Sequence, residues 1–195
     1  MKDYQRRPDE VADEAWQRGY LTALELFRVA AWKSAKALAQ LTLNSESDIK
    51  RTTTQAIDGI RPWKGKPMLA VDDDACWDAW RQTANSVIGI QDQTGLLALE
   101  GVGYRVATAI LVILDPEVWP VIVRWATQTV FGKPLGWYGV ARYAAYTRHL
   151  ANVGHPCWPE EPSIHALDQR AMRTASHGWP LPSGWTYAVI PKRTS

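Results

Sequence analysis

Two glycines separated by one residue, Gly101 and Gly103, stand before the apolar run of residues 106–114. Glycine reaches backbone angles that other residues avoid, and it lets another backbone approach closely. Val102 between the glycines can point inward and fix the turn to a core. The amides that would open the following helix belong to Gly103, Tyr104 and Arg105. Because the first amides of a helix attract anions, the spacing predicts a tight helical hairpin over residues 93–114 that binds a phosphate group.

Carboxylates close to this hairpin are the next candidates for chemistry. Asp115 and Glu117 directly follow the hairpin's second helix, and Glu100 precedes the turn. A carboxylate beside a reacting group can stabilise positive charge that develops in a transition state. We therefore keep Asp115 and Glu117 as candidate catalytic groups, although Asp115-Pro116 is also a common helix terminus.

Metal-ligand and nucleophile patterns are weak in this sequence. The four histidines lack the spacing of zinc ligands, and the acidic run at 72–74 suits the start of a helix. Lys33 could act as a nucleophile only if it were desolvated, so we expect a phosphate contact or a solvated helix face there. We predict no metal site.

The periodicity of apolar residues predicts an all-α protein. Helices are expected over residues 9–20, 21–41, 76–90, 92–100, 104–114, 118–131, 137–153 and 163–176, and a further one starts within 44–48 and continues to 57. The expected inner face of the second helix consists of Leu24, Phe27, Ala31, Ala35 and Leu38. A loop with three prolines is expected over 154–162, and an irregular tail over 178–195. We therefore place one helical domain over residues 1–177, and a chain of this length also allows two closely packed lobes.

The hairpin and the segment after it resemble a known family. The motif Leu-x-Gly-Val-Gly-x-x-x-Ala begins at Leu99, and an apolar helix, Pro116 and the run Trp119-Pro120-Val121-Ile122 follow it. This order and spacing resemble those of the helix-hairpin-helix DNA glycosylases. The resemblance covers about residues 94–132 and is a general helical likeness elsewhere.

The resemblance implies a two-lobed all-α fold, a duplex DNA partner and a pocket for a damaged or modified base extruded from the helix. The DNA contacts of the hairpin would come from Gly101, Val102, Gly103, Tyr104 and Arg105. We expect Arg124 and Lys33 to add phosphate contacts. A monovalent cation at the hairpin would fit the resemblance, and no other cofactor is expected.

Two positions depart from the family pattern. The family's catalytic aspartate follows the Pro-Val-x run, where this chain has Val123, and the lysine nucleophile of bifunctional members is replaced by Arg105. Valine offers neither charge nor a hydrogen bond, and arginine stays protonated at working pH. The sequence therefore favours DNA binding over catalysis. Any remaining activity would be monofunctional, with a relocated carboxylate or with a cationic purine that leaves easily.

Tryptophan is unusually frequent, with 11 among 195 residues. Most of these side chains are expected in the core. A few can line a pocket for an extruded base, because flat aromatic faces stack well on bases. We expect Trp32, Trp119 and Trp125 in this role.

Composition fits a globular protein, with 46% hydrophobic and 22% charged residues and a net charge of +2. Two cysteines cannot supply the four thiolates of an iron–sulfur cluster. No apolar stretch is long enough to span a membrane, and the first ten residues lack the apolar core of a signal peptide. We expect a cytoplasmic monomer, associated with the nucleoid in a bacterium.

Three functions remain open. The first is an active glycosylase whose carboxylate lies elsewhere. The second is an inactive DNA reader, whether valine at position 123 is natural or introduced. The third is a helical scaffold for protein partners, which the low net charge allows.

Overall fold

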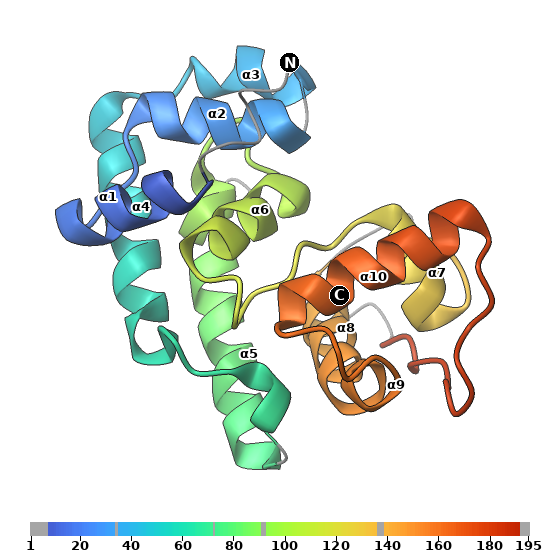
Figure 1. Ribbon diagram of the computed structural model, residues 1–195. Helices are drawn as coiled ribbons and strands as arrows, with labels where there is room; N and C mark the ends of the chain where they lie inside the picture. Colours follow the sequence, from blue (N-terminus) through green and yellow to red (C-terminus); the bar gives the residue numbers. More distant parts are fainter. Residues whose placement is uncertain (1–7, 34, 72, 91–92, 136–138, 192–195) are drawn as a thin grey trace. The chain divides into compact units, whose positions relative to one another are not determined.

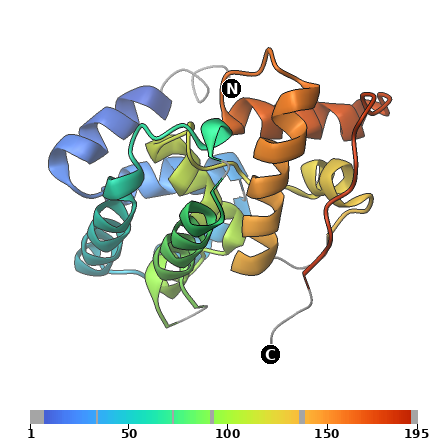
Figure 2. The ribbon, with the colours of Figure 1, turned by 90° about the horizontal axis from the view of Figure 1, so that it is seen from below.

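The computed structural model describes residues 8–33, 35–71, 73–90, 93–135 and 139–191 (Figures 1 and 2). All regular elements within these ranges are helices, which confirms the all-α prediction. The chain divides into two compact units. Unit 1 comprises residues 1–64 and 83–115, and unit 2 comprises residues 65–82 and 116–195. The boundary falls inside helix α5 (Asp74–Ile88).

Unit 1 is built around α6 (Tyr104–Leu114), the helix that follows the two glycines. Every residue from Val106 to Val112 is buried, because this helix is apolar on all sides and lies in the core. Helices α1 (Pro8–Arg18) and α2 (Ala23–Lys33) pack against it. The other elements of unit 1 are α3 (Ala35–Leu41), α4 (Glu46–Ile60), the 3-10 helices η2 (Arg61–Trp63) and η4 (Gly95–Ala98), and the end of α5.

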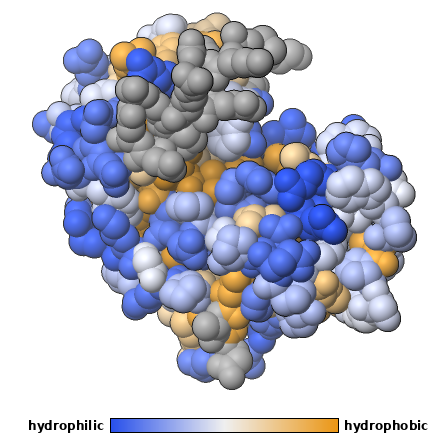
Figure 3. Space-filling view, viewed as in Figure 1, coloured by the Kyte–Doolittle hydropathy of each residue, from blue (hydrophilic) through white to orange (hydrophobic). Residues whose placement is uncertain are grey.

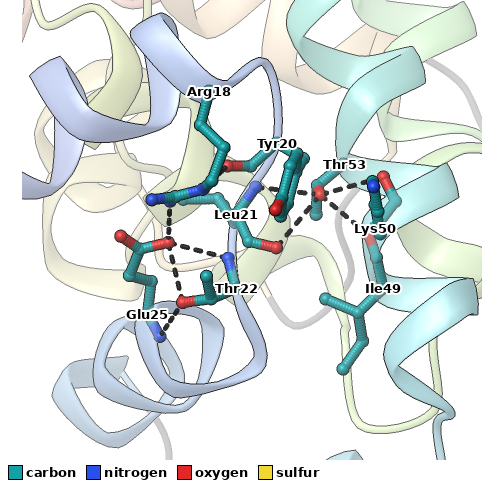
Figure 4. Close-up of polar contacts among 8 residues, drawn as sticks. All are labelled: Arg18, Tyr20, Leu21, Thr22, Glu25, Ile49, Lys50 and Thr53. Carbon is teal, nitrogen blue, oxygen red and sulfur yellow. Dashed lines mark hydrogen bonds and ion pairs between the residues drawn. The ribbon is translucent and has the colours of Figure 1, made fainter.

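Side-chain hydrogen bonds fix the start of α2 (Figure 4). The hydroxyl of Thr22 accepts from the amide of Glu25 at 3.3 Å, and the carboxylate of Glu25 accepts from the amide of Thr22 at 2.7 Å. This reciprocal pair is a capping box. Arg18 at the end of α1 pairs with the same carboxylate, so one buried acid joins the two helices. The amide of Leu21 donates to the hydroxyl of Thr53 at 3.0 Å, which ties the connection to α4.

The predicted inner face of the second helix is wrong. Leu24 is 61% exposed, and the buried residues of α2 are Glu25, Leu26, Val29 and Ala30. The capping box is the physical reason, because it turns the Glu25 carboxylate inward to meet Thr22 and Arg18. The structure describes α2 and α3 where one helix over 21–41 was expected, and position 34 lies outside the described residues.

The first arm of the predicted hairpin is also different, because residues 95–98 form only the short 3-10 helix η4. Two glycines with positive φ close the chain before it. A Cβ on Gly89 would lie 1.9 Å from the carbonyl oxygen of Thr94, and a Cβ on Gly95 would lie 2.6 Å from that of Val87. The expected helix over 92–100 is therefore reduced to η4 within the described residues, and position 92 lies outside them.

Unit 2 has an aromatic core. Trp80, in the middle of α5, stacks on Trp119 with the ring centroids 4.8 Å apart, and Trp77 meets Trp80 edge-on at 6.0 Å. Tyr143 packs against Trp80 at 5.5 Å. Trp77 and Trp80, three residues apart on α5, therefore both pack inward. The elements around this core are η3 (Met68–Ala70), α7 (Arg124–Phe131), α8 (Val140–His149), the π-helical turn η5 (Leu150–Gly154), α9 (His155–Cys157) and α10 (Ile164–His177).

Two boundaries in unit 2 differ from the predictions. Helix α7 begins at Arg124 rather than near 118, and the buried segment before it is not helical. The carbonyl of Pro120 in this segment accepts from the hydroxyl of Tyr143 at 2.8 Å. The loop expected over 154–162 begins only after Cys157. A π-helical turn directly before Pro156 accommodates the missing proline N–H, so the helical path continues into α9.

The described part of the tail, residues 178–191, is irregular, as predicted, and two of its hydrogen bonds reach α7. The indole N–H of Trp185 donates to the carbonyl oxygen of Thr129 at 3.1 Å, and the amide of Ala188 donates to that of Val130 at 2.8 Å. Both acceptors lie in the last turn of α7, whose carbonyl groups have no partners within the helix. The tail therefore caps α7.

None of the described helices has the length and apolar character needed to cross a membrane.

Candidate nucleic-acid interface

Gly101 sits where only glycine fits. Its φ is +80°, and a Cβ there would lie 2.6 Å from the carbonyl oxygen of Ala37 and 3.0 Å from the amide nitrogen of Leu41. Helix α3 thus presses its backbone against the turn. Both properties attributed to the glycines, unusual backbone angles and close approach of another backbone, apply at this position.

Gly103 differs from this expectation. Its φ of −93° and ψ of 177° are extended angles open to any residue, and nothing lies within 4 Å of the point where a Cβ would stand. Neither the local backbone nor the packing of unit 1 requires glycine here. The residue is exposed and forms the N-cap of α6, where its carbonyl accepts from the amides of Val106 and Ala107 at 2.9 Å.

The rest of the turn is anchored from both sides. Val102 is buried, as expected, and its amide donates to the carbonyl of Leu99 at 3.0 Å. Asn44 holds Glu100 from the outside: its side-chain oxygen accepts from the amide of Glu100 at 2.9 Å, and its side-chain nitrogen donates to the carbonyl at 3.0 Å. The sequence analysis missed this role of Asn44, because only the fold brings positions 44 and 100 together.

The other expected contacts of unit 1 lie at the N-terminus of α6 and the end of α2. Arg105 is exposed and Tyr104 is half-buried. Lys33 ends α2, and its ammonium lies 3.7 Å from the centroid of the Trp32 ring. This ring is 47% exposed, so Trp32 and Lys33 form a cationic and aromatic surface rather than part of the core.

Val123 belongs to unit 2 and occupies the N-cap position of α7. Its φ of −128° and ψ of 153° are those of an N-cap, and its carbonyl accepts from the amide of Thr127 at 3.0 Å. Serine, threonine, aspartate and asparagine are preferred there because their side chains accept a hydrogen bond from the first turn. Valine cannot, and α7 has no side-chain cap. Arg124 and Trp125 follow in the first turn, both exposed.

Trp119 lies in the core instead of on a surface. Its ring is fully buried and stacked on Trp80, which favours a packing role over contact with an extruded base. The segment between Trp119 and Val123 is held by a hydrogen bond from the hydroxyl of Tyr143 to the carbonyl oxygen of Pro120. Burial, together with the charge of Asp168, raises the pKa of the Tyr143 hydroxyl well above its usual value.

The candidate carboxylates Asp115 and Glu117 belong to different units of the chain. Asp115 is buried at the C-terminal end of α6 in unit 1, where its amide donates to the carbonyl of Leu111 at 2.9 Å. Glu117 is half-buried in unit 2, and its carbonyl accepts from the amide of Met68 at 3.5 Å. A third carboxylate, Asp168, is buried on α10 and accepts from the hydroxyl of Tyr146. Within the described ranges, no cluster of three or more histidine, cysteine, aspartate or glutamate side chains could hold a metal ion.

Comparison with known proteins finds no matching family model, no similar curated protein and no similar solved structure. The function is therefore argued from the chain itself.

Proposed function

We propose that this protein is a helix-hairpin-helix protein of the DNA glycosylase type, which binds duplex DNA through residues 101–105 and recognises a damaged or modified base. The hairpin would approach a phosphate with the N-terminus of α6. Unit 1 and unit 2 would then correspond to the two lobes expected from the family resemblance. No strong positive charge is needed, because phosphate affinity depends on a few local contacts.

Gly103 is the observation that carries this proposal. It is exposed, it has ordinary backbone angles, and open space surrounds the position of its missing side chain. Glycine at the N-cap of a helix keeps the nearby amides open to a large anion, whereas a side chain would stand in front of them. The packing of the chain does not explain why glycine stands at position 103. A phosphate that approaches the helix from outside would explain it, because it needs the space that a side chain would fill.

The chemistry at position 123 decides between an enzyme and a reader. An aspartate at the N-cap of α7 would carry the negative charge that an N-glycosidic transition state requires. Valine leaves that position without charge. We therefore propose DNA binding with the usual catalysis absent, and base release would depend on a carboxylate elsewhere, with Asp115 and Glu117 as the first candidates.

Gly103→Ala tests the binding role with little risk to the fold. Alanine suits the backbone angles of Gly103 and clashes with nothing in unit 1. We expect Gly103→Ala to weaken binding of a labelled DNA duplex by tenfold or more, and Gly103→Arg to abolish it, while the melting temperature of the alanine variant changes little. Unchanged duplex affinity in both variants would show that the hairpin does not bind DNA.

Base release is measured separately by mass spectrometry of free bases after incubation with damaged DNA. The parent chain, Val123→Asp and Val123→Asn are compared. Release by Val123→Asp alone identifies an intact pocket that lacks its carboxylate, and the asparagine variant controls for helix capping without charge. Release by the parent identifies an active enzyme. If duplex binding is insensitive to salt and no variant releases a base, a protein-binding scaffold is the better description.

A further inference from the structure

A ladder of aromatic and cationic side chains crosses unit 2. The ring of His177 stacks on Trp179 with centroids 4.9 Å apart, and the guanidinium carbon of Arg170 lies 5.4 Å from the Trp179 centroid. The same carbon lies 5.9 Å from the centroid of Trp158. The ladder continues from Trp158 to Trp185 at 4.7 Å. We call these residues, His177, Trp179, Arg170, Trp158 and Trp185, the α10 ladder.

The end of α10 builds this ladder. Gly178 has a φ of +65°, its amide donates to the carbonyl of Ala175, and the amide of Trp179 donates to that of Thr174 at 2.9 Å. This pair of bonds is a Schellman motif, which reverses the chain directly after the helix. The reversal folds Trp179 back along α10, next to both His177 and Arg170.

The guanidinium of Arg170 has no counterion in the part of the chain that the structure describes. It lies beside the two indole rings, no described acceptor receives a hydrogen bond from it, and its Nε is buried without a partner. Arginine presents five N–H donors in a fixed planar fork. The ladder therefore holds this fork in one orientation while leaving its charge uncompensated.

A second arginine and the histidine share the same face of the helix. Arg170, Arg173 and His177 follow the i, i+3, i+7 spacing of one helical face. Arg173 is 43% exposed and pairs with Glu161 only at 3.7 Å. Only Arg173 of the two arginines pairs with this carboxylate. The surface over α10 is mainly hydrophilic in Figure 3.

We propose that Arg170 and Arg173 bind phosphate groups, with the backbone of a nucleic acid as the main source. Cationic groups interleaved with aromatic rings are typical of surfaces that bind nucleic acids. The site lies on α10 of unit 2 and does not use the hairpin, so it stands independently of the function proposed above. Free phosphate or a small phosphorylated molecule has the same chemistry and is distinguished by the test.

The test measures binding of a labelled single-stranded oligothymidylate by fluorescence anisotropy over about 50 to 200 mM salt. We expect Arg173→Gln and Arg170→Gln each to weaken binding at least threefold and to lower the slope of log K against log salt by about 0.7. Arg81→Gln is the matched control, because it removes the same charge from an exposed, paired arginine on α5 of the same unit. Equal effects in the control and in both α10 variants would overturn the proposal.

Two further measurements separate the alternatives. Arg173 lies outside the ladder, so Arg173→Gln keeps the fold even if Arg170→Gln loosens the tail, and near-ultraviolet circular dichroism checks both variants. Inorganic phosphate is titrated while the Arg170 Nε–H signal is followed by NMR: a shift identifies free phosphate as a ligand, and a shift with the oligonucleotide alone identifies the nucleic acid. If neither probe shifts the signal, or if only Gly103→Ala weakens single-strand binding, the α10 site is wrong while the hairpin proposal stands.

Discussion

The carbonyl oxygen of Ala37 lies 2.6 Å from the point where a Cβ on Gly101 would stand. Gly101→Ala should therefore destabilise unit 1, since the left-handed angle costs an alanine about 1 to 2 kcal/mol and the contact with α3 adds to that. Urea unfolding measures the loss. Gly103→Ala is the matched control, two residues away with open space and extended angles, and it should stay within about 1 kcal/mol of the parent.

Equal losses in these two alanine variants would contradict the different roles assigned to the glycines. A large loss at Gly103 alone would mean that its space is filled in solution. In either case the binding test with Gly103→Ala would lose its meaning, because affinity could no longer be separated from stability.

The N-cap of α7 provides a second prediction. Val123→Asp and Val123→Asn should each stabilise unit 2 by about 1 kcal/mol, because either side chain can accept a hydrogen bond from the first turn of the helix. At low salt, Val123→Asp should be slightly more stable than Val123→Asn, because the charge of the aspartate interacts with the helix dipole. The midpoint of urea unfolding measures both, with Val123→Ala as a control that should show no gain. Loss of stability in both capped variants would place the Val123 side chain in essential packing.

Burial of His149 predicts a pH dependence. Its imidazole lies beneath Trp185 at 5.2 Å, and desolvation lowers the pKa to about 4, against a backbone hydrogen bond to Thr186 that raises it. Since the unfolded chain has the ordinary pKa of 6.5, it binds more protons than the folded protein between these values. The neutral ring thus makes its full contribution to the free energy of unfolding above pH 6.5, and this contribution is lost as the pH falls to about 4.

This lowering of the His149 pKa corresponds to at most about 3 kcal/mol in the free energy of unfolding. Melting temperatures from pH 7.5 downward should fall more steeply for the parent than for His149→Phe, which cannot be protonated. Parallel curves for the two proteins would mean that the histidine is already hydrated in the folded state.

Local signals in the sequence predicted several elements well. Ser45 and Ser163 each accept a hydrogen bond from an amide three residues later, as expected for the starts of α4 and α10, and α6 has the predicted bounds. Such caps and a continuous apolar run depend on neighbouring residues only. The prediction of the buried face of α2 was wrong for the opposite reason. Glu25 is buried because it pairs with Arg18, which lies on the preceding helix.

The candidate site was likewise predictable from the sequence only in part. Residue type and spacing identified the glycine pair, but the contact with Ala37 that separates Gly101 from Gly103 comes from α3, more than sixty positions earlier. The α10 ladder joins Trp158, Arg170, Trp179 and Trp185 through a chain reversal at Gly178. Periodicity along one helix contains no information on such a pairing, so the tail could be predicted as irregular but not as packed.

Trp185 connects the tail to α7, and its replacement provides the last prediction. Its indole N–H donates to the carbonyl oxygen of Thr129, and its ring packs between Trp158 and His149. Trp185→Ala should destabilise unit 2 by about 2 kcal/mol, less than a fully buried tryptophan because its ring is half-buried. The tail should also become sensitive to limited proteolysis after Gly178.

Trp185→Phe separates the two contributions of this side chain. Phenylalanine keeps an aromatic ring against Trp158 but cannot donate to Thr129, so it should lose about 1 kcal/mol, the usual net value of one hydrogen bond. Trp179→Ala is the control from the other end of the tail, where the ring is 44% exposed and makes no contact with α7 among the described residues. Cleavage of the tail at the same rate in all three variants and the parent would show that the cap on α7 does not hold the tail in solution. Faster cleavage in Trp185→Ala alone would show that the packing of the Trp185 ring, rather than its hydrogen bond to Thr129, holds the tail on unit 2.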